Sequence, residues 1–252
     1  MQLLIDADIL LYRAASSVER EIEFEEDIWV LYTDETEAIE AFTSSVADLL
    51  EQADTYGYLL CFSDSQNFRK DILPTYKGQR TGRKPMGFKA IREKLMDGYA
   101  HKLVMKPTLE ADDCIGILAT KYPDDYVIWS ADKDLKQIPG KHLVDGEFIT
   151  VSEEEADKFF YTQVLTGDTA DNYKGCPGIG AVKAEAILLA KKHPEQSFDD
   201  IRSQWWLRVR DAFLKAGLTE EDALVQARVA RILRHSDWDQ KKQEVKLWLP
   251  LS

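Results

Sequence analysis

Leu3-Leu4-Ile5-Asp6 is a short apolar run that ends in an aspartate. The pattern recurs twice along the chain, in Tyr58-Leu59-Leu60-Cys61-Phe62 before Asp64 and in Tyr126-Val127-Ile128-Trp129 before Asp132. Continuous apolar runs of this length are typical of strands that are buried on both faces of a parallel sheet. Because ligands of open α/β sheets bind beyond the carboxyl ends of the strands, we expect the three aspartates to share that edge.

Helical patterns separate these runs. Residues 37–52 place apolar side chains at helical spacing, so the order reads β-α-β-α-β with helices on both faces of the sheet. From about Tyr161 onward the strand pattern fades, and three segments predict helices: 181–192, 205–216 and 219–235. The sequence therefore predicts an α/β fold with a central, mainly parallel sheet in residues 1–160 and a helical lobe in residues 161–252.

The composition is that of a globular protein. The chain has 252 residues, of which 44% are hydrophobic, enough for a sizeable core. No run approaches the roughly 18 consecutive apolar residues of a membrane helix, and the first residues lack the positive charge that opens a signal peptide. We therefore expect a soluble, intracellular protein. The three cysteines are far apart and predict neither a disulfide framework nor a zinc site.

Charge is segregated along the chain. The net charge of −13 argues against a nucleic-acid partner at first. However, residues 66–106 hold eleven Lys or Arg and three acids, a local charge of +8 that leaves −21 for the rest. This segment is either a solvated helical face or a basic surface for a polyanion.

Acidic residues gather at the predicted strand ends and at three further places. Besides Asp6 and Asp64, they are Glu110, Asp112 and Asp113, then Asp132 and Asp134, and finally Asp168 and Asp171. Taken singly, each is explained as a helix cap or as a partner of a helix dipole. Together, nine carboxylates in one pocket would repel one another unless cations neutralised them. Oxygen ligands without Cys or His select hard ions, so we expect magnesium, with manganese as a substitute. Two such ions predict hydrolysis of a phosphodiester.

Basic and glycine-rich segments supply candidate phosphate contacts. Five cations follow Asp64 closely and could hold the scissile phosphate: Arg69, Lys77, Arg80, Arg83 and Lys84. Tyr76 and Phe88 lie among them, either as core residues or as stacking platforms for bases. The turn that contains Gly175, Gly178 and Gly180 precedes a predicted helix, with Lys183 nearby, and either joins two helices or cradles a phosphate.

These motifs, in this order, resemble the flap endonuclease family of structure-specific 5′ nucleases, which includes the 5′ nuclease domain of bacterial DNA polymerase I. The resemblance is closest to the 5′→3′ exonucleases of short-tailed phages and covers nearly the whole chain. It rests on Leu4-Ile5-Asp6, Phe62-Ser63-Asp64, Tyr76-Lys77-Gly78-Gln79-Arg80, Leu109-Glu110-Ala111-Asp112-Asp113, Ser130-Ala131-Asp132-Lys133-Asp134 and residues 167–180, and on the tail segments 230–234 and 247–250.

The resemblance implies a PIN-like 5′ nuclease fold with a two-metal site. One ion would be held mainly by Asp6, Asp64, Glu110, Asp112 and Asp113, and the other mainly by Asp132, Asp134, Asp168 and Asp171. Lys77 and Arg80 would match the residues of the family's arch, here within 66–106, that engage the cleaved phosphate. Residues 165–192 would form a helix-three-turn-helix motif that grips duplex DNA and holds a potassium ion.

The resemblance also implies partners and a cellular setting. The substrates would be double-stranded DNA with 5′ ends or 5′ flaps and RNA–DNA hybrids, including RNA primers, in phage-type replication and recombination. We expect a monomer without a membrane partner, in the cytoplasm, or in the host cytoplasm if a phage encodes it. Asp8 stands where many relatives carry an uncharged residue, so it is expected to support the site from outside the ligand set.

Two alternatives stay open at this point. Asp6-Ala7-Asp8 after a strand also resembles the opening motif of haloacid-dehalogenase-type phosphatases, although Leu10 stands where that family has Thr or Val. The other alternative is a non-catalytic DNA-binding module with a structural acidic cluster. It is disfavoured because carboxylates repel DNA unless metal ions intervene.

Overall fold

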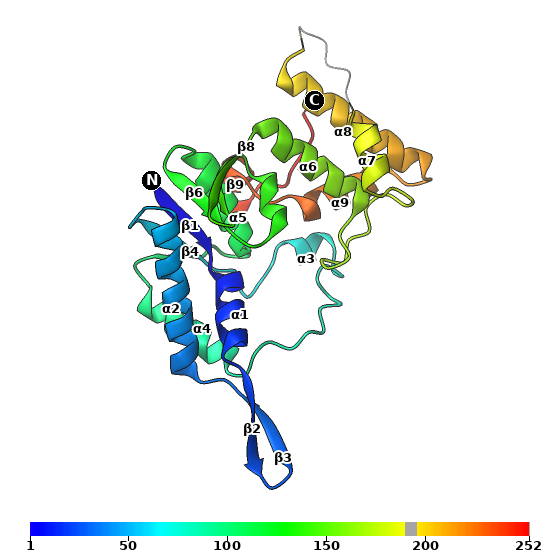
Figure 1. The fold of residues 1–252 in the computed structure, drawn as a ribbon. Helices are drawn as coiled ribbons and strands as arrows, with labels where there is room; N and C mark the ends of the chain where they lie inside the picture. The colour runs from blue at the N-terminus through cyan, green and yellow to red at the C-terminus, as the bar shows by residue number, and fades with distance from the viewer. Residues whose placement is uncertain (190–195, 252) are drawn as a thin grey trace.

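The fold is built on a six-stranded sheet (Figure 1). The computed structural model describes residues 1–189 and 196–251. The strand order is β5-β4-β1-β6-β7-β8, parallel except for the antiparallel pair β7 and β8. The strands are β1 (Gln2–Asp6), β4 (Tyr58–Cys61), β5 (Leu103–Val104), β6 (Tyr126–Trp129), β7 (Gly140–Val144) and β8 (Glu147–Val151). The predicted central, mainly parallel sheet is confirmed, and β1 lies between β4 and β6 as the three apolar runs require.

Helices cover both faces of this sheet. One face packs against α1 (Ala7–Ser17), α2 (Glu35–Gln52) and α4 (Phe88–Gly98) through a core cluster that includes Leu3, Ile5 and Phe42. The other face packs against α5 (Ala111–Lys121) through a second cluster that includes Leu4 and Ile128. Successive residues of β1 thus point into two different cores, which explains why its sequence is apolar without alternation.

The C-terminal third is helical, as predicted. It contains α6 (Glu153–Thr166), α7 (Ala181–Leu188), α8 (Phe198–Lys215) and α9 (Glu220–Ala230), which share a core rich in aromatic side chains such as Trp205 and Trp206. After α9 the chain returns to α5, where Ile232 and Leu233 join the core on that face of the sheet. The predicted boundary at residues 160 and 161 falls inside α6, and the division into two domains stays a prediction.

The helix boundaries differ from the sequence prediction in three places. The helix predicted for 181–192 ends at Leu188, and residues 190–192 lie outside the described residues. The helix predicted for 205–216 begins earlier, because Ser197 and Asp200 form a capping box at its start. The helix predicted for 219–235 ends at Ala230, where the chain turns to reach α5.

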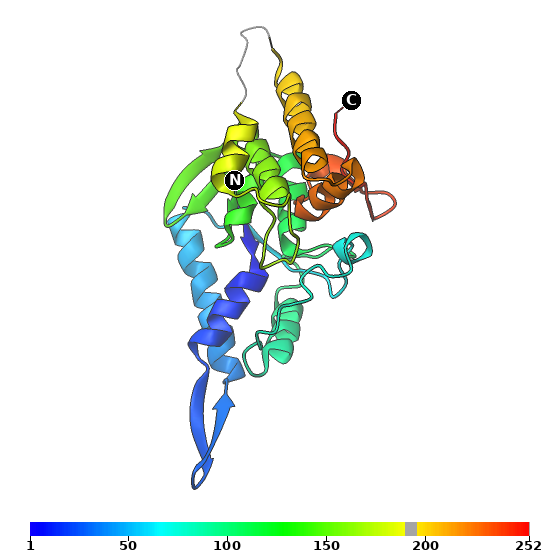
Figure 2. The same ribbon diagram turned by 90° about the vertical axis from the view of Figure 1, so that its right-hand side faces the viewer.

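A hairpin that the sequence analysis did not predict projects from the body of the protein. It consists of β2 (Arg20–Glu25) and β3 (Ile28–Tyr32), which pair with each other in a two-stranded sheet (Figures 1 and 2). The remaining elements are α3 (Arg69–Ile72), two 3₁₀ helices, η1 (Lys133–Gln137) and η2 (His235–Asp237), and the small strand pair β9 (Trp238–Asp239) and β10 (Glu244–Val245). Within the described residues, no helix is long and apolar enough to span a bilayer.

Candidate active site

The first acidic residue of the site lies where β1 becomes α1. Asp6 ends the strand and caps the helix: its Oδ1 accepts the N–H of Ile9 at 3.2 Å, and its Oδ2 accepts the hydroxyl of Ser130, which follows β6, at 2.9 Å. Burial and the nearby charge of Asp8 raise the pKa of Asp6 to about 7, and Asp132 adds a smaller contribution. The carboxyl ends of β1 and β6 therefore meet, as the sequence predicts.

Asp132 and Asp134 follow β6 and face the loop that follows α6. Asp132 caps η1 by accepting the N–H of Asp134 at 2.9 Å. Burial, followed by the charges of Asp132 and Asp168, raises the pKa of Asp134 to about 6, and Asp171 adds to this shift. Among the described side chains, Asp134 Oδ1 is one of the few buried polar atoms without a hydrogen-bond partner, which normally costs free energy.

Glu110, Asp112 and Asp113 stand at the start of α5, where Glu110 and Asp113 form a capping box. Asp113 is fully buried, and its two oxygens accept the guanidinium of Arg69 at 2.7 Å each and the backbone N–H groups of Glu110 and Leu233. Burial and the charges of Asp113 and Glu110 raise the pKa of Asp112 well above its ordinary value. Asp112 and Asp113 thus stand in different surroundings although they are adjacent in the chain.

Tyr76 and Lys77 connect Glu110 with Asp171, and Arg80 contacts Asp171 as well. The Tyr76 hydroxyl donates to Asp171 at 2.8 Å and lies 3.0 Å from Glu110, and Lys77 Nζ contacts Glu110 and lies 3.6 Å from Asp171. Arg80 donates to the other oxygen of Asp171 at 2.5 Å. Burial alone would raise the pKa of Glu110, but the charges of Lys77 and Arg69 outweigh it and hold that pKa at about 2.

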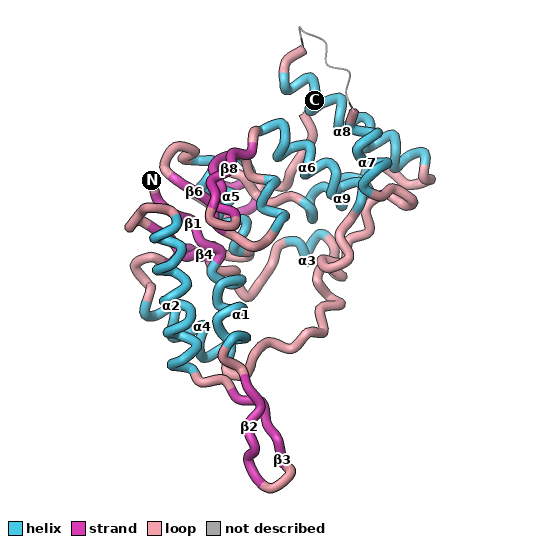
Figure 3. The backbone as a smooth tube through the Cα atoms, in the orientation of Figure 1, coloured by secondary structure: helices cyan, strands magenta, loops and turns pink. Residues whose placement is uncertain are grey.

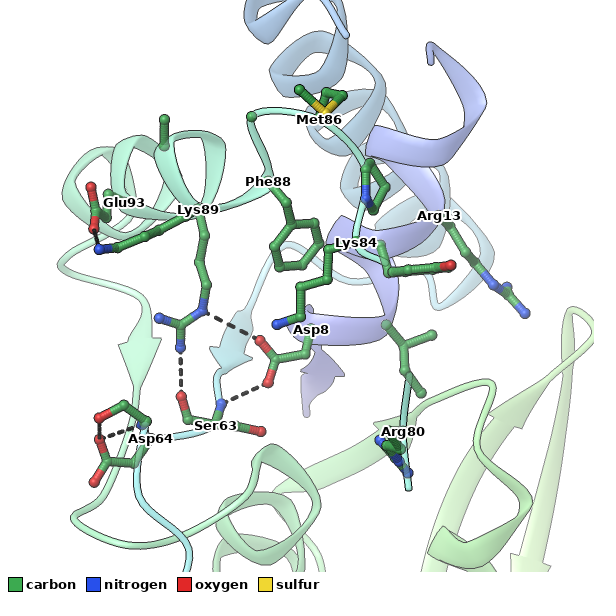
Figure 4. A pocket seen from close by; sticks show the side chains of 17 residues that line it. Asp8, Arg13, Ser63, Asp64, Arg80, Lys84, Met86, Phe88, Lys89 and Glu93 are labelled. Carbon is green, nitrogen blue, oxygen red and sulfur yellow. Dashed lines mark hydrogen bonds and ion pairs between the residues drawn. The ribbon is translucent and has the colours of Figure 1, made fainter. Parts of the chain in front are cut away.

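Asp64 lies in the loop after β4, and Asp8 lies in the first turn of α1 (Figure 4). Asp64 accepts the N–H groups of Ser65 and Thr108, and the latter bond lowers its pKa most. Asp8 accepts the N–H of Ser63 at 2.8 Å, and Arg92 donates to the Ser63 carbonyl and lies 3.6 Å from Asp8. Asp8 and Arg92 therefore clamp the peptide that precedes Asp64.

The nine carboxylates are linked to one another through shared neighbours, such as Tyr76 between Glu110 and Asp171. Within residues 1–189 and 196–251, no three acidic, His or Cys side chains form a group arranged to hold a metal ion. Protein donors engage most of these oxygens: Arg69 pairs with Asp113, Lys77 pairs with Glu110, and backbone N–H groups donate to Asp64. The convergence of all nine carboxylates on one pocket stays a prediction. Whether each residue ligates a metal stays a prediction.

The donor set nevertheless fits hard divalent cations. Asp6, Asp112 and Asp134 all have pKa values raised by burial and by neighbouring carboxylates, which is the state that a bound cation relieves. The unpartnered Oδ1 of Asp134 lies among acidic neighbours from its own segment and from the loop after α6. All these donors are oxygens, the ligand type that magnesium and manganese prefer.

A cavity of about 1290 Å³ lies beside the acidic edge, between α1, the loop before α4 and the end of β4 (Figure 4). Its lining holds more cations than acids and is partly aromatic. It includes Arg13, Arg80, Lys84, Lys89 and Arg92, the acids Asp8, Asp64 and Glu93, and the rings of Tyr12 and Phe88. Arg80 and Lys84 thus lie where a polyanion could reach them. Arg83 lies outside this lining and is held by Glu19 at 2.6 Å.

The structure corrects the prediction for Arg69. This residue was predicted to contact DNA, but its side chain is only 1% exposed. Its guanidinium N–H groups donate to Asp113, to Glu110 and to the backbone carbonyls of Val229 and Arg231. A buried arginine cannot reach a phosphate in solvent, so its role is to orient the acidic residues of α5. Tyr76 and Phe88 are also buried, which favours the core alternative for both.

The glycine-rich turn links α6 to α7. Gly175 and Gly178 have φ values of +63° and +74°, in the left-handed region that favours glycine. A Cβ on Gly175 would come within 2.3 Å of the Gly167 nitrogen, so the two ends of this loop touch closely. Lys183 Nζ donates to the Gly178 carbonyl at 2.8 Å, and Gly180 caps α7.

The sequence did not reveal two further features of the site: the hydroxyl of Tyr76, which bridges Glu110 and Asp171, and the contact of Arg92 with the peptide before Asp64. Both depend on segments that are far apart in the chain.

Comparisons with known proteins show the family and the fold of the chain. A model of the 5′-3′ exonuclease N-terminal, resolvase-like domain matches residues 1–166. The chain is 29% identical to the exodeoxyribonuclease of Enterobacteria phage T3, over 99% of this chain and 93% of that protein. It is also 29% identical to the exonuclease of Escherichia phage T7, over 98% and 93%.

A solved structure shares the fold. The bacteriophage T5 flap endonuclease, in a pseudo-enzyme–product complex with DNA and metal ions, matches with a TM-score of 0.58 and 14% identity, over 91% of this chain and 92% of that one. The protein is thus a nuclease of the 5′-3′ exonuclease and flap endonuclease class. More particularly, the chain belongs to the family of the 5′-3′ exonuclease N-terminal, resolvase-like domain. This membership decides against the phosphatase and the non-catalytic module.

Proposed function

We propose that this nuclease hydrolyses DNA phosphodiester bonds from 5′ ends with two magnesium ions, for which manganese can substitute. The observation that carries the proposal is Asp134 Oδ1, a buried carboxylate oxygen without a partner beside Asp132 and Asp168. Such an atom is stabilised when a cation binds it. The T5 relative in fold, whose structure contains metal ions and DNA, supports the same chemistry.

The proposed ligands divide between the two sides of the acidic edge. Asp6, Glu110 and Asp112 would hold one ion, with Asp64 beside them, and Asp132, Asp134, Asp168 and Asp171 would hold the other. Asp113 would act on the site through Arg69, because its oxygens are already engaged. The chemistry that two divalent ions supply in such a site is activation of water and stabilisation of the leaving oxygen.

The protein's own cations would position the scissile phosphate. Lys77 is half-buried between Glu110 and Asp171, and Arg80 reaches Asp171 from the cavity side. Both side chains would be free to donate to a phosphate oxygen in place of a carboxylate, because the acids would pair with the bound metal ions. Fixed cations of this kind stabilise negative charge that develops on the phosphate.

The substrate would be duplex DNA with 5′ ends or 5′ flaps, and RNA–DNA hybrids. The T3 relative is an exodeoxyribonuclease, and the T5 structure is a complex with DNA. The basic cavity offers Arg80 and Lys84 to one strand, and the turn with Gly175, Gly178 and Gly180 offers backbone groups to the duplex, with a potassium ion there and with Lys183 nearby. We further propose that the protein acts as a monomer in the cytoplasm of the cell in which the DNA replicates.

End-labelled duplex DNA tests the proposal directly. The wild-type protein should release 5′ products with magnesium and none with EDTA, and Asp132→Ala should lose cleavage while it retains DNA binding in a gel-shift assay. Asp124→Ala is the matched control, because Asp124 is exposed and precedes β6 at its opposite end. Equal cleavage by Asp132→Ala and Asp124→Ala would contradict the assignment of Asp132 to a metal ion.

A further inference from the structure

Within the part of the chain that the structure describes, the hairpin formed by β2 and β3 is uncovered along most of its length. It extends away from the sheet and its helices in both views (Figures 2 and 3). Its base is tied to the body, because Arg20 pairs with Glu37 at 2.7 Å and the adjacent Glu19 pairs with Arg83. The residues beyond the base are exposed on both faces, with Ile22 alone partly covered. The hairpin is therefore a fixed but uncovered two-stranded sheet.

Its exposed side chains are strongly apolar. Phe24 is 70% exposed and Trp29 is 60% exposed, and the rest of β3 is exposed as well: Ile28, Val30, Leu31 and Tyr32. Isolated two-stranded hairpins are at best marginally stable in water, and three or more strands are normally needed. Contiguous apolar surface of this kind marks an interaction site in soluble proteins.

The two edges of the hairpin differ. In β2, Glu21, Glu23 and Glu25 alternate with apolar residues, and the register is irregular near Glu23; charges and bulges of this kind protect the outer edge of a strand against pairing. The outer edge of β3 belongs to Ile28–Tyr32, which contains no charged residue, and β3 pairs only with β2 among the described strands. Such an edge is a template for an added strand.

Charge restricts what can occupy this edge. Residues 20–32 contain five acids and one arginine, a net charge of −4. Nucleic acid is therefore repelled. A second copy is disfavoured for the same reason, because each chain carries a net charge of −13 and an equally acidic hairpin. The register places Glu23 opposite Trp29 and Glu21 opposite Leu31 on one face, so an apolar and acidic surface lies beside the open edge.

We propose that β3 is a docking site for another protein, which adds an extended segment of alternating basic and apolar residues as a third strand. Because the side chains of a strand alternate between the two faces, its apolar side chains would cover Ile28 and Val30 on one face. Its basic side chains would lie over Trp29 and Leu31 on the other face and pair there with Glu21 and Glu23. The backbone of β3 would supply the hydrogen bonds, as in other cases of strand addition. The nuclease would in this way be recruited by a partner without use of its DNA-binding surfaces.

A synthetic ten-residue peptide that alternates lysine and valine is the probe, with the full-length protein as receptor. Fluorescence anisotropy should detect binding that weakens with added salt, and hydrogen exchange should show slower exchange at Ile28–Tyr32. Two double variants, Trp29→Ser/Leu31→Ser and Glu21→Gln/Glu23→Gln, should each weaken binding at least tenfold. Phe148→Ser is the matched control, because Phe148 is 51% exposed on β8, the edge strand of the main sheet, and it should bind as the wild type does.

Cleavage of 5′-ended duplex should be unchanged in all these variants, which shows that they fold. The inference is overturned if a peptide with glutamate in place of lysine binds equally, or if protection appears at β8. It is also overturned if a DNA oligonucleotide protects the hairpin. Self-association in sedimentation that is lost with Trp29→Ser/Leu31→Ser would overturn it in favour of a second copy.

Discussion

The acidic edge of the sheet and the hairpin are both rich in carboxylates, but their surroundings differ. At the edge, Asp6 and Asp113 are buried, and their neighbours either raise the pKa of the carboxyl, as for Asp6, or bind it with a buried cation, as Arg69 does for Asp113. On the hairpin, Glu21 and Glu23 are exposed to water beside exposed apolar side chains. Burial and the choice of partner, more than composition, decide whether acidic residues serve chemistry or recognition.

The buried pair of Arg69 and Asp113 gives the largest expected effect. Their side chains are 2% and 0% exposed, so Arg69→Leu leaves the buried Asp113 carboxyl without its cation, and we expect a loss of about 3–5 kcal/mol in the free energy of unfolding. Urea denaturation measures this loss. Lys89→Ala is the control, because the Lys89–Glu93 pair is 3.8 Å long and exposed, and it should change stability by less than about 1 kcal/mol. Similar losses in both variants would show that burial of an ion pair does not determine how much it contributes to the free energy of unfolding.

Lys77→Ala tests the site rather than the core. Lys77 neutralises Glu110 and lies beside Asp171, so we expect cleavage in single-turnover assays to slow by about 10²–10³-fold, the range for loss of one group that stabilises transition-state charge. The fold should persist, because the lysine side chain reaches solvent. Lys70→Ala, an exposed lysine of the same basic segment, should cleave as the wild type does. An unchanged rate for Lys77→Ala would remove Lys77 from the site.

Much of the fold could be predicted because its signals are local. Three runs are apolar without interruption: 3–5, 58–62 and 126–129. Each of them forms a strand of the main sheet, with an aspartate at or just beyond its end. The hairpin was missed although Arg20–Glu25 alternates charged and apolar residues, because its Glu26-Asp27 turn has no glycine. Arg69 was misassigned for another reason: its partner Asp113 is far away in the sequence, and composition does not show burial.

Gly175→Ala tests the turn that the sequence pattern located. Its positive φ and the contact with Gly167 leave no room for a Cβ, so we expect it to destabilise the protein by about 1–3 kcal/mol more than Gly178→Ala. Gly178 has a similar φ but open space around it, so it reports backbone strain alone. Thermal unfolding measures both variants. Equal losses would mean that the loop relaxes around the added methyl group.

The smallest effect is expected on the hairpin. Trp29→Ala removes a side chain that is 60% exposed and outside the main core, so stability should change by no more than about 0.5 kcal/mol. Trp205→Ala is the matched contrast: Trp205 is 2% exposed and donates to the Leu188 carbonyl, and its loss should cost about 3–5 kcal/mol. The free energies of unfolding in urea then distinguish a tryptophan that stabilises the fold from one that does not. If Trp29→Ala were as destabilising as Trp205→Ala, the hairpin would be part of the fold's core, and its exposed apolar residues would need no partner to explain them.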